Sequence, residues 1–226
     1  MSILAINVKR VASTLILCLA AFALGSTLAP KANSATVDYN RTAAANYALK
    51  YACNGSNCRN PAYASHSSDC TNFASQVLAA GGKKNVMSGS RIWYFLTKST
   101  QSASWNENTA FEAFWTESGK GRSTQTSFAS KMKNAYTNAS RGDVYVYDWG
   151  RGSGWSHLAV SAGYGAFASY YDSGAKRNYR SITDGTGDYV AQHSTDRVKS
   201  PWNWGYWTEK DPTVRAKMKT KIIHIK

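Results

Sequence analysis

The chain has 226 residues, a formal net charge of +14 and four cysteines. This length allows one domain with a sizeable core. So basic a chain favours a polyanionic partner, such as an anionic cell wall, a membrane surface or nucleic acid. It contains no nucleic-acid-binding motif, and its basic residues are scattered outside residues 215–226. We therefore expect no nucleic-acid partner.

Residues 1–35 have the order of a secretory signal peptide. Lys9 and Arg10 precede an apolar run that ends near Leu28, and small or polar residues follow it. The alternative is an uncleaved membrane anchor, for which this run is short. We predict a secreted or wall-associated protein, with residues 36–226 as a single domain and no membrane contact after cleavage. Cleavage removes three basic residues and no acidic one, which lowers the net charge to +11.

Three cysteines remain after cleavage. Cys53 and Cys58 lie on either side of a short segment rich in Asn, Gly and Ser, which a disulfide could close. That pairing leaves Cys70 odd. An odd cysteine in an exported protein indicates an intermolecular bridge, an inert buried thiol or a nucleophile.

The first half of the mature chain has the periodicity of helices. Over residues 37–52, Tyr39, Ala43, Tyr47 and Tyr51 recur at steps of four, with Asp38 near the expected cap. A second helix is expected over residues 70–80, ending at Gly81, and a third over residues 126–139.

From residue 141 onward the pattern alternates, as in strands. Four strands are expected, over residues 142–149, 156–165, 188–194 and 221–226. Helices followed by hairpin-linked strands predict an α+β fold, in which N-terminal helices pack on a C-terminal, mostly antiparallel sheet.

The predicted second helix gives Cys70 a defined position. Cys70 shares an apolar stripe with four residues of that helix, Phe73, Ala74, Val77 and Leu78. It should therefore point toward the sheet from the first turn, where backbone N–H groups and the helix dipole would lower the pKa of its thiol. Asp69 is expected to cap the helix.

His157 is the best candidate for a base that activates Cys70. It begins a predicted strand, on the same face as the small residues Ala159 and Ser161, which leave space beside the imidazole. A polar residue of the next strand should orient the ring. The candidates are Gln192, His193 and Asp196.

Other chemistries have weaker support in the sequence. His66 lies in a Ser-rich loop and is expected at the surface, and His224 alternates with isoleucines and is expected to be structural. No paired metal-ligand spacing accompanies Cys70, so we expect neither a metal nor a cofactor. A serine nucleophile lacks the G-x-S-x-G signal.

The segment NPAYASHSSDCTNFASQVLAAGG (residues 60–82) resembles the core motif of the putative amidase domain family of secreted bacterial proteins. The resemblance continues in YNRTAAANYALKYA, in RGDVYVYDWGRGSGWSHLAVSAGYG and in YVAQHSTD, which together with it cover most of the mature chain. That family is related to the CHAP and NlpC amidases and peptidases. The resemblance therefore implies a papain-like fold of the CHAP/NlpC type.

The resemblance also implies roles for individual residues. Cys70 would be the nucleophile, His157 the base, and His193 the third polar residue. Papain-like enzymes supply an upstream Gln to the oxyanion hole, but this chain has no Gln between residues 36 and 70. The candidates for that role are backbone amides and three side chains, Asn60, Tyr63 and Asp69.

The reaction implied is amide hydrolysis through a Cys70 thioester, with peptidoglycan or another extracellular peptide or amide as the substrate. We expect the enzyme to be a monomer. Residues 200–207 hold three tryptophans and a tyrosine, which could bind glycan or pack in the core or a lid. Two alternatives remain. One is an acyltransferase, crosslinking enzyme or toxin on the same fold; the other is a catalytically inactive module that binds the wall.

Overall fold

The computed structural model describes residues 38–52, 58–127, 132, 134–167, 171–172, 177–178 and 185–226. The predicted signal peptide lies outside the described residues, and so does Cys53. The signal peptide and the Cys53–Cys58 disulfide therefore stay predictions. None of the described helices is long and apolar enough to cross a membrane.

Helices α1 (Arg41–Tyr51) and α2 (Cys70–Ala80) begin the described fold. They confirm the two predicted N-terminal helices, although α1 starts later than expected. Asn40 caps it, because its Oδ1 accepts a hydrogen bond from the backbone N–H of Ala43 at 2.9 Å. Gly81 ends α2, donating its backbone N–H to the carbonyl of Val77.

The chain then forms a hairpin and two short helices. These elements are β1 (Phe95–Thr97), β2 (Thr100–Gln101), α3 (Ala103–Asn106) and α4 (Asn108–Trp115). The aromatic side chains of α3 and α4 are buried and that of Phe95 is partly buried. Trp105 Nε1 donates a hydrogen bond to Asn72 Oδ1 of α2 at 2.9 Å.

The main sheet has six strands. They are β3 (Ser123–Ser127), β4 (Val144–Asp148), β5 (Trp155–Ala166), β8 (Thr186–Gln192), β9 (Arg197–Pro201) and β10 (Lys219–Ile225). Their order is β3-β10-β4-β5-β8-β9, and every neighbouring pair is antiparallel. The α+β fold with a mostly antiparallel sheet is therefore confirmed, and the four predicted strands correspond to β4, β5, β8 and β10.

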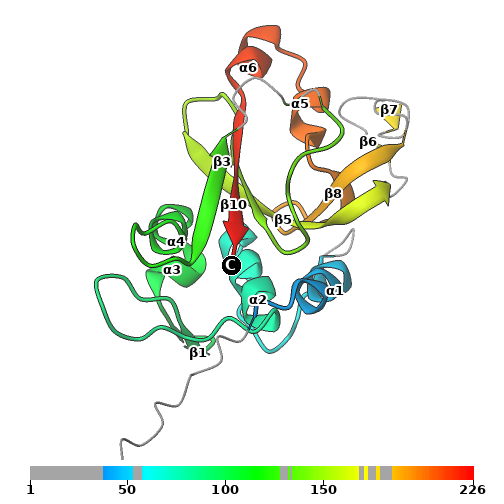
Figure 1. Ribbon diagram of the computed structural model, residues 1–226. Helices are drawn as coiled ribbons and strands as arrows, with labels where there is room; N and C mark the ends of the chain where they lie inside the picture. Colours follow the sequence, from blue (N-terminus) through cyan, green and yellow to red (C-terminus); the bar gives the residue numbers. More distant parts are fainter. Residues whose placement is uncertain are drawn as a thin grey trace, which may run out of the picture. The chain divides into compact units, whose positions relative to one another are not determined.

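Four further elements complete the described fold. Strands β6 (Tyr171–Asp172) and β7 (Arg177–Asn178) pair with each other, and α5 (Trp204–Thr208) and α6 (Pro212–Lys217) lie between β9 and β10. Figure 1 shows α1 to α4 gathered around one end of β10, and α5 and α6 near its other end.

The prediction of a helix over residues 126–139 is wrong for the part of this segment that the structure describes. Thr126 and Ser127 belong to β3, and residues 134–140 are not helical. Strand β10 supplies the reason, because its backbone pairs with β3 as far as Ser127. Tertiary pairing overrides a local helical pattern here. Residues 128–131 and 133 lie outside the described residues.

The sheet separates two hydrophobic clusters. The larger one holds residues of α1 to α4 together with Leu158, Val160 and Ala191 of the sheet. The smaller one holds Ala159 and Val190, on the opposite face, with Tyr147 and Trp202 among its other members. Adjacent residues of β5 and of β8 thus face opposite sides, as the pleat requires.

Candidate active site around Cys70

Cys70 is the first residue of α2 and is 5% exposed. The four apolar residues that share its predicted stripe are all fully buried. The thiol hydrogen-bonds with the backbone of Leu158 on β5 and lies 3.9 Å from the Thr71 hydroxyl. The start of α2 therefore places the Cys70 sulfur against Leu158, the strand residue that follows His157.

Burial raises the pKa of the Cys70 thiol, although hydrogen bonds from Leu158, Thr71 and the Cys70 backbone act in the opposite direction. The expectation that the helix terminus would lower this pKa is wrong. The first-turn N–H groups are present, but the desolvation of a nearly enclosed thiolate outweighs them. The resting group is a neutral thiol.

His157 lies on β5 opposite Tyr147 of β4 and is 7% exposed. Its ring lies 6.0 Å from that of Tyr147 and 5.8 Å from that of Trp149. The pKa of His157 is lowered to about 4, mainly by burial. A side-chain hydrogen bond with Gln192 opposes this shift, and the charge of Arg197 adds to it. The imidazole is therefore neutral at pH 7 and able to accept a proton.

The two ring nitrogens of His157 have different surroundings. Nε2 is buried without a hydrogen-bond partner, and the ring forms a side-chain hydrogen bond with Gln192. The bond raises the pKa of His157, so the ring donates it and the amide oxygen of Gln192 accepts. Nε2 is then the nitrogen with a free lone pair.

Gln192 is the last residue of β8 and is fully buried. Its Nε2 donates to the carbonyl of Thr195 at 3.0 Å, and its Oε1 accepts from Trp204 Nε1 at 3.2 Å. These two bonds fix the amide with its oxygen available to His157. Trp204 itself packs between Arg197, 3.9 Å above its ring, and Trp149, at 5.3 Å between ring centroids.

His193 has a different environment, although it follows Gln192 directly. Its Nδ1 lies 2.5 Å from Asp69 Oδ2, its Nε2 lies 2.7 Å from the carbonyl of Tyr51, and its ring stacks on Phe73 at 4.0 Å. Both nitrogens are thus engaged on the helix side of the sheet. The structure brings Gln192 to His157, and it places His193 against α1 and α2.

Asp69 precedes α2 but makes no side-chain cap hydrogen bond with it. The prediction that the Asp69 side chain caps α2 is wrong, because its carboxylate accepts hydrogen bonds from other donors. Oδ1 accepts from the His66 backbone at 3.0 Å and from the Asn72 amide at 2.8 Å. Oδ2 lies 3.4 Å from the guanidinium of Arg59, besides its contact with His193.

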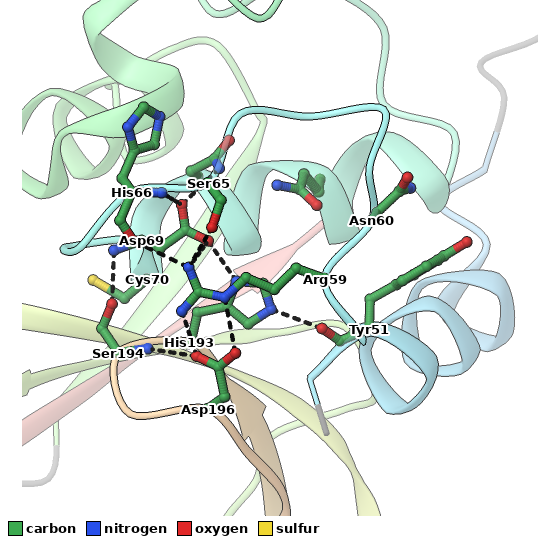
Figure 2. Close-up of polar contacts among 12 residues, drawn as sticks. Tyr51, Arg59, Asn60, Ser65, His66, Asp69, Cys70, His193, Ser194 and Asp196 are labelled. Carbon is green, nitrogen blue, oxygen red and sulfur yellow. Dashed lines mark hydrogen bonds and ion pairs between the residues drawn. The ribbon is translucent and has the colours of Figure 1, made fainter. Parts of the chain in front are cut away.

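Asp196 lies in the same group of charges (Figure 2). It forms a two-bond pair with Arg59, at 2.8 Å to Nε and 2.5 Å to NH2. Burial raises the pKa of Asp196, but Arg59 and the charge of His193 lower it, and the result is below the ordinary value. Asp196 is thus an ionised partner of Arg59.

The other oxyanion candidates are engaged elsewhere. Asn60 donates to the Tyr47 hydroxyl at 2.9 Å and accepts from the backbone of Ala62. The ring of Tyr63 packs against Phe95 at 4.7 Å and Trp105 at 5.9 Å. The donors that the structure gives the sulfur are the backbone groups of Thr71 and Leu158 and the Thr71 hydroxyl.

The remaining histidines have structural surroundings. His66 is partly buried rather than at the surface, and its Nε2 lies in the interior without a hydrogen-bond partner. His224 pairs with Asp143 at 2.9 Å, which agrees with a structural role. Within the described part of the chain, no group of three His, Cys, Asp or Glu side chains is arranged to hold a metal ion.

An open cavity of about 390 Å³ lies beside the start of β5. Trp155, two residues before His157, forms part of its wall. The other lining residues are Thr109, Glu112, Ala113, Thr116 and Ser153. Trp202 of the aromatic segment 200–207 is fully buried, whereas Trp204, Tyr206 and Trp207 are partly buried. Trp202 is thus part of the core, and Trp204 and Tyr206 pack against neighbouring side chains while staying partly exposed.

Sequence reasoning missed three contributors to this site. Trp204 was predicted only as part of a segment that binds glycan or packs in the core or a lid. No sequence pattern pointed to Arg59 or Leu158. Leu158 acts through its backbone, which no residue pattern reveals, and Arg59 pairs with Asp196, 137 positions away.

A class of protein can now be assigned from comparison with known families. Residues 38–216 match the family described as "Putative amidase domain", and the chain belongs to that family. A stretch of 125 residues is 33% identical to the "Uncharacterized protein YhbB" of Bacillus subtilis (strain 168). The stretch covers 54% of this chain and 36% of that protein, so this chain spans little more than a third of its relative. No solved structure matches the chain.

Proposed function

We propose that this protein is a secreted, cysteine-dependent amidase or peptidase with a papain-like arrangement of its site. Cys70 is the nucleophile, His157 the general base and acid, and Gln192 the residue that orients His157. One observation carries the proposal: the Cys70 thiol meets the backbone of Leu158, directly beside a buried histidine whose Nε2 is free. Membership of an amidase family supports hydrolysis of an amide as the reaction.

The reaction begins from a neutral pair. His157 Nε2 takes the proton of the Cys70 thiol as the sulfur attacks the substrate carbonyl carbon. The tetrahedral oxyanion is stabilised by backbone N–H groups at the start of α2. The imidazolium then protonates the leaving amine as the C–N bond breaks, and a thioester remains. A water molecule, losing its proton to Nε2, releases the acid and restores the thiol.

Gln192 supports both proton transfers. Its amide oxygen accepts the Nδ1 proton of His157, which keeps the lone pair of the neutral ring on Nε2. Nε2 makes no hydrogen bond with the thiol in the substrate-free protein. Catalytic hydrogen bonds of this kind are often long before substrate binds and shorten in the complex.

Peptidoglycan is the substrate we propose. The mature chain carries a net charge of +11, which suits an anionic wall. The cavity beside β5 joins the indole of Trp155 to hydroxyl and carboxylate side chains, a combination suited to sugar or peptide groups. The proposed chemistry uses side chains and water alone, in a single polypeptide.

Digestion of purified peptidoglycan by the wild type and by Cys70→Ala tests this function. The wild type should release soluble fragments and Cys70→Ala should release none. Mass spectrometry then identifies the bond: new amino termini mean cleavage within the stem peptide, and free lactyl groups mean cleavage between sugar and peptide. Equal release by both proteins would refute the nucleophile. Incorporation of an added amine without hydrolysis would establish the acyltransferase instead.

A further inference from the structure

Four charged or ionisable side chains form a cluster next to the start of α2 and take no part in the proposed mechanism. They are Arg59, Asp69, His193 and Asp196, and Figure 2 shows them joined by hydrogen bonds and ion pairs. The side chains of Asp69 and His193 are each 1% exposed, and that of Arg59 is 19% exposed. A network so deeply buried and so close to the thiol requires its own explanation.

Every partner of the Asp69 carboxylate is a hydrogen-bond donor. Oδ1 receives two N–H groups, from the His66 backbone and the Asn72 amide. Oδ2 faces the Arg59 guanidinium at 3.4 Å and His193 Nδ1 at 2.5 Å. An anion is the state that such a set of donors favours, and a carboxylic acid would have to point its own proton at one of them.

His193 is held by acceptors in the same way. Its Nε2 lies 2.7 Å from the Tyr51 carbonyl, an atom that can only accept. That contact requires a proton on Nε2. The contact with the anionic Asp69 requires a second proton, on Nδ1.

We propose that His193 is a buried imidazolium and a positioning residue, which together with Arg59 balances Asp69 and Asp196 and fixes the start of α2. This inference rests on the proposed function, since it concerns how Cys70 is held. The cluster then contains two cations and two anions, and each of its short contacts joins a donor to an acceptor.

The connection to Cys70 is direct. The Asp69 backbone N–H donates to the Ser194 hydroxyl at 2.7 Å, and that hydroxyl donates to the carbonyl of Ser67. The turn after β8 is thereby joined to the segment that leads into α2. His193 also binds the last residue of α1. Loss of its charge would leave Asp69 partly uncompensated, one residue from the sulfur.

The groups that face His193 come from every element packed against it. Helix α1 contributes the Tyr51 carbonyl, the segment before α2 contributes Arg59 and Asp69, and α2 contributes the ring of Phe73. The turn after β8 contributes Asp196, whose pKa the charge of His193 lowers. His157 is not among these groups, because its ring lies beside those of Tyr147 and Trp149.

Nitrogen NMR of the histidine rings tests the protonation state without any substrate. The chain has four histidines, so ¹⁵N-histidine labelling gives a spectrum that His66→Gln and His224→Gln help to assign. At pH 7 we expect both nitrogens of His193 to have protonated shifts, while His157 shows one protonated and one bare nitrogen. A bare nitrogen on His193 at pH 7 would overturn the proposal.

Alkylation of Cys70 by iodoacetamide tests the positioning role in the whole protein. His193→Gln removes a cation near the thiol, so the pH midpoint of alkylation should rise by about half a unit. His224→Gln is the matched control, because it removes a histidine from the buried carboxylate of Asp143 far along the chain. The control should keep the wild-type midpoint. A midpoint for His193→Gln that is unchanged or lower contradicts the proposal.

These measurements separate the two proposals. If peptidoglycan is not cleaved but His193 is an imidazolium and its variant shifts the alkylation midpoint, the substrate assignment fails and the inference stands. If peptidoglycan is cleaved and His193 is neutral, the inference fails alone. Should His193→Gln not fold, Asp69→Asn gives the second variant, with loss of one protonated His193 nitrogen as its expected result.

Discussion

His157 forms a side-chain hydrogen bond with Gln192, while Nε2 of His157 is buried without a hydrogen-bond partner. The relationship links the last residue of β8 to the beginning of β5. Both partners of this hydrogen bond, His157 and Gln192, are uncharged at pH 7. The predictions below test how much of the chemistry depends on it.

Replacing Gln192 should change both the rate and the pH dependence of the reaction. Gln192→Ala removes the acceptor, so His157 loses its orientation and kcat should fall by about a hundredfold. Gln192→Glu supplies an anionic acceptor, which should raise the pKa of His157 and move the acidic limb of kcat/KM from about pH 4 to higher pH.

Gln76→Ala is the matched control for these variants, because Gln76 is also a buried glutamine and accepts a bond from Tyr47 at 2.7 Å. It should leave the acidic limb in place. An acidic limb for Gln192→Glu that coincides with that of the wild type would show that Gln192 does not act on His157.

His157 should make the protein less stable in mild acid. Its pKa is about 4 when folded and about 6.5 when unfolded. The unfolded chain therefore binds more protons between these values, and stability is lost as the pH falls from about 6.5 to about 4. The loss from this group approaches about 3 kcal/mol. Urea unfolding at pH 7 and pH 4.5 should show a smaller loss for His157→Gln than for the wild type; equal losses would contradict the buried neutral ring.

Trp204→Phe should test the support of Gln192. The substitution keeps an aromatic ring under Arg197 but removes the N–H that bonds to Gln192 Oε1. We expect kcat to fall about fivefold. The double variant with Gln192→Ala should be no slower than Gln192→Ala alone, because Trp204 acts through Gln192.

Trp207→Phe provides the control, since Trp207 Nε1 is buried without a hydrogen-bond partner. It should keep the wild-type rate. Additive losses in the Trp204 and Gln192 double variant would mean that Trp204 acts on the substrate or on His157 directly.

Asn72 should be important for stability. It is buried and bonds through one amide to Trp105, to the Ala64 carbonyl and to Asp69. Asn72→Leu leaves these three groups without partners, and should lower the free energy of unfolding by about 2 to 4 kcal/mol. Asn46→Leu makes the same change at an exposed position of α1 and should alter it by less than about 0.5 kcal/mol. Similar effects in urea unfolding would show that the amide contacts contribute little.

The sequence allowed α2 and its cysteine to be predicted because the information is local. An apolar stripe, a first-turn cysteine and a terminal glycine all lie within twelve residues. The same holds for the alternating strands β4, β5, β8 and β10. The helix over residues 126–139 failed because pairing between β3 and β10, which no local pattern contains, decides the structure there.

The orienting residue shows a different limit. Gln192 and His193 were both candidates, and resemblance favoured His193. Which of the two faces His157 depends on the pairing of β8 with β5, where the register shifts between Ser161 and Gly163. The prediction of a lowered pKa for the Cys70 thiol was wrong for a related reason. The sequence shows the start of the helix but not how deeply the thiol is buried there.

The opposite orientation of Gln192 and His193 has a consequence for how this site can change. Between Gly185 and His193 the chain carries the amide to one face of the sheet and the charged histidine to the other. Deleting one residue of β8 before Gln192 would bring His193 to the place of Gln192 beside His157, and inserting one there would bring Gln192 to the place of His193 beside Asp69. The length of β8 is therefore as important for the site as the residues it carries. Substitutions in this strand can preserve the site, whereas insertions and deletions disrupt it.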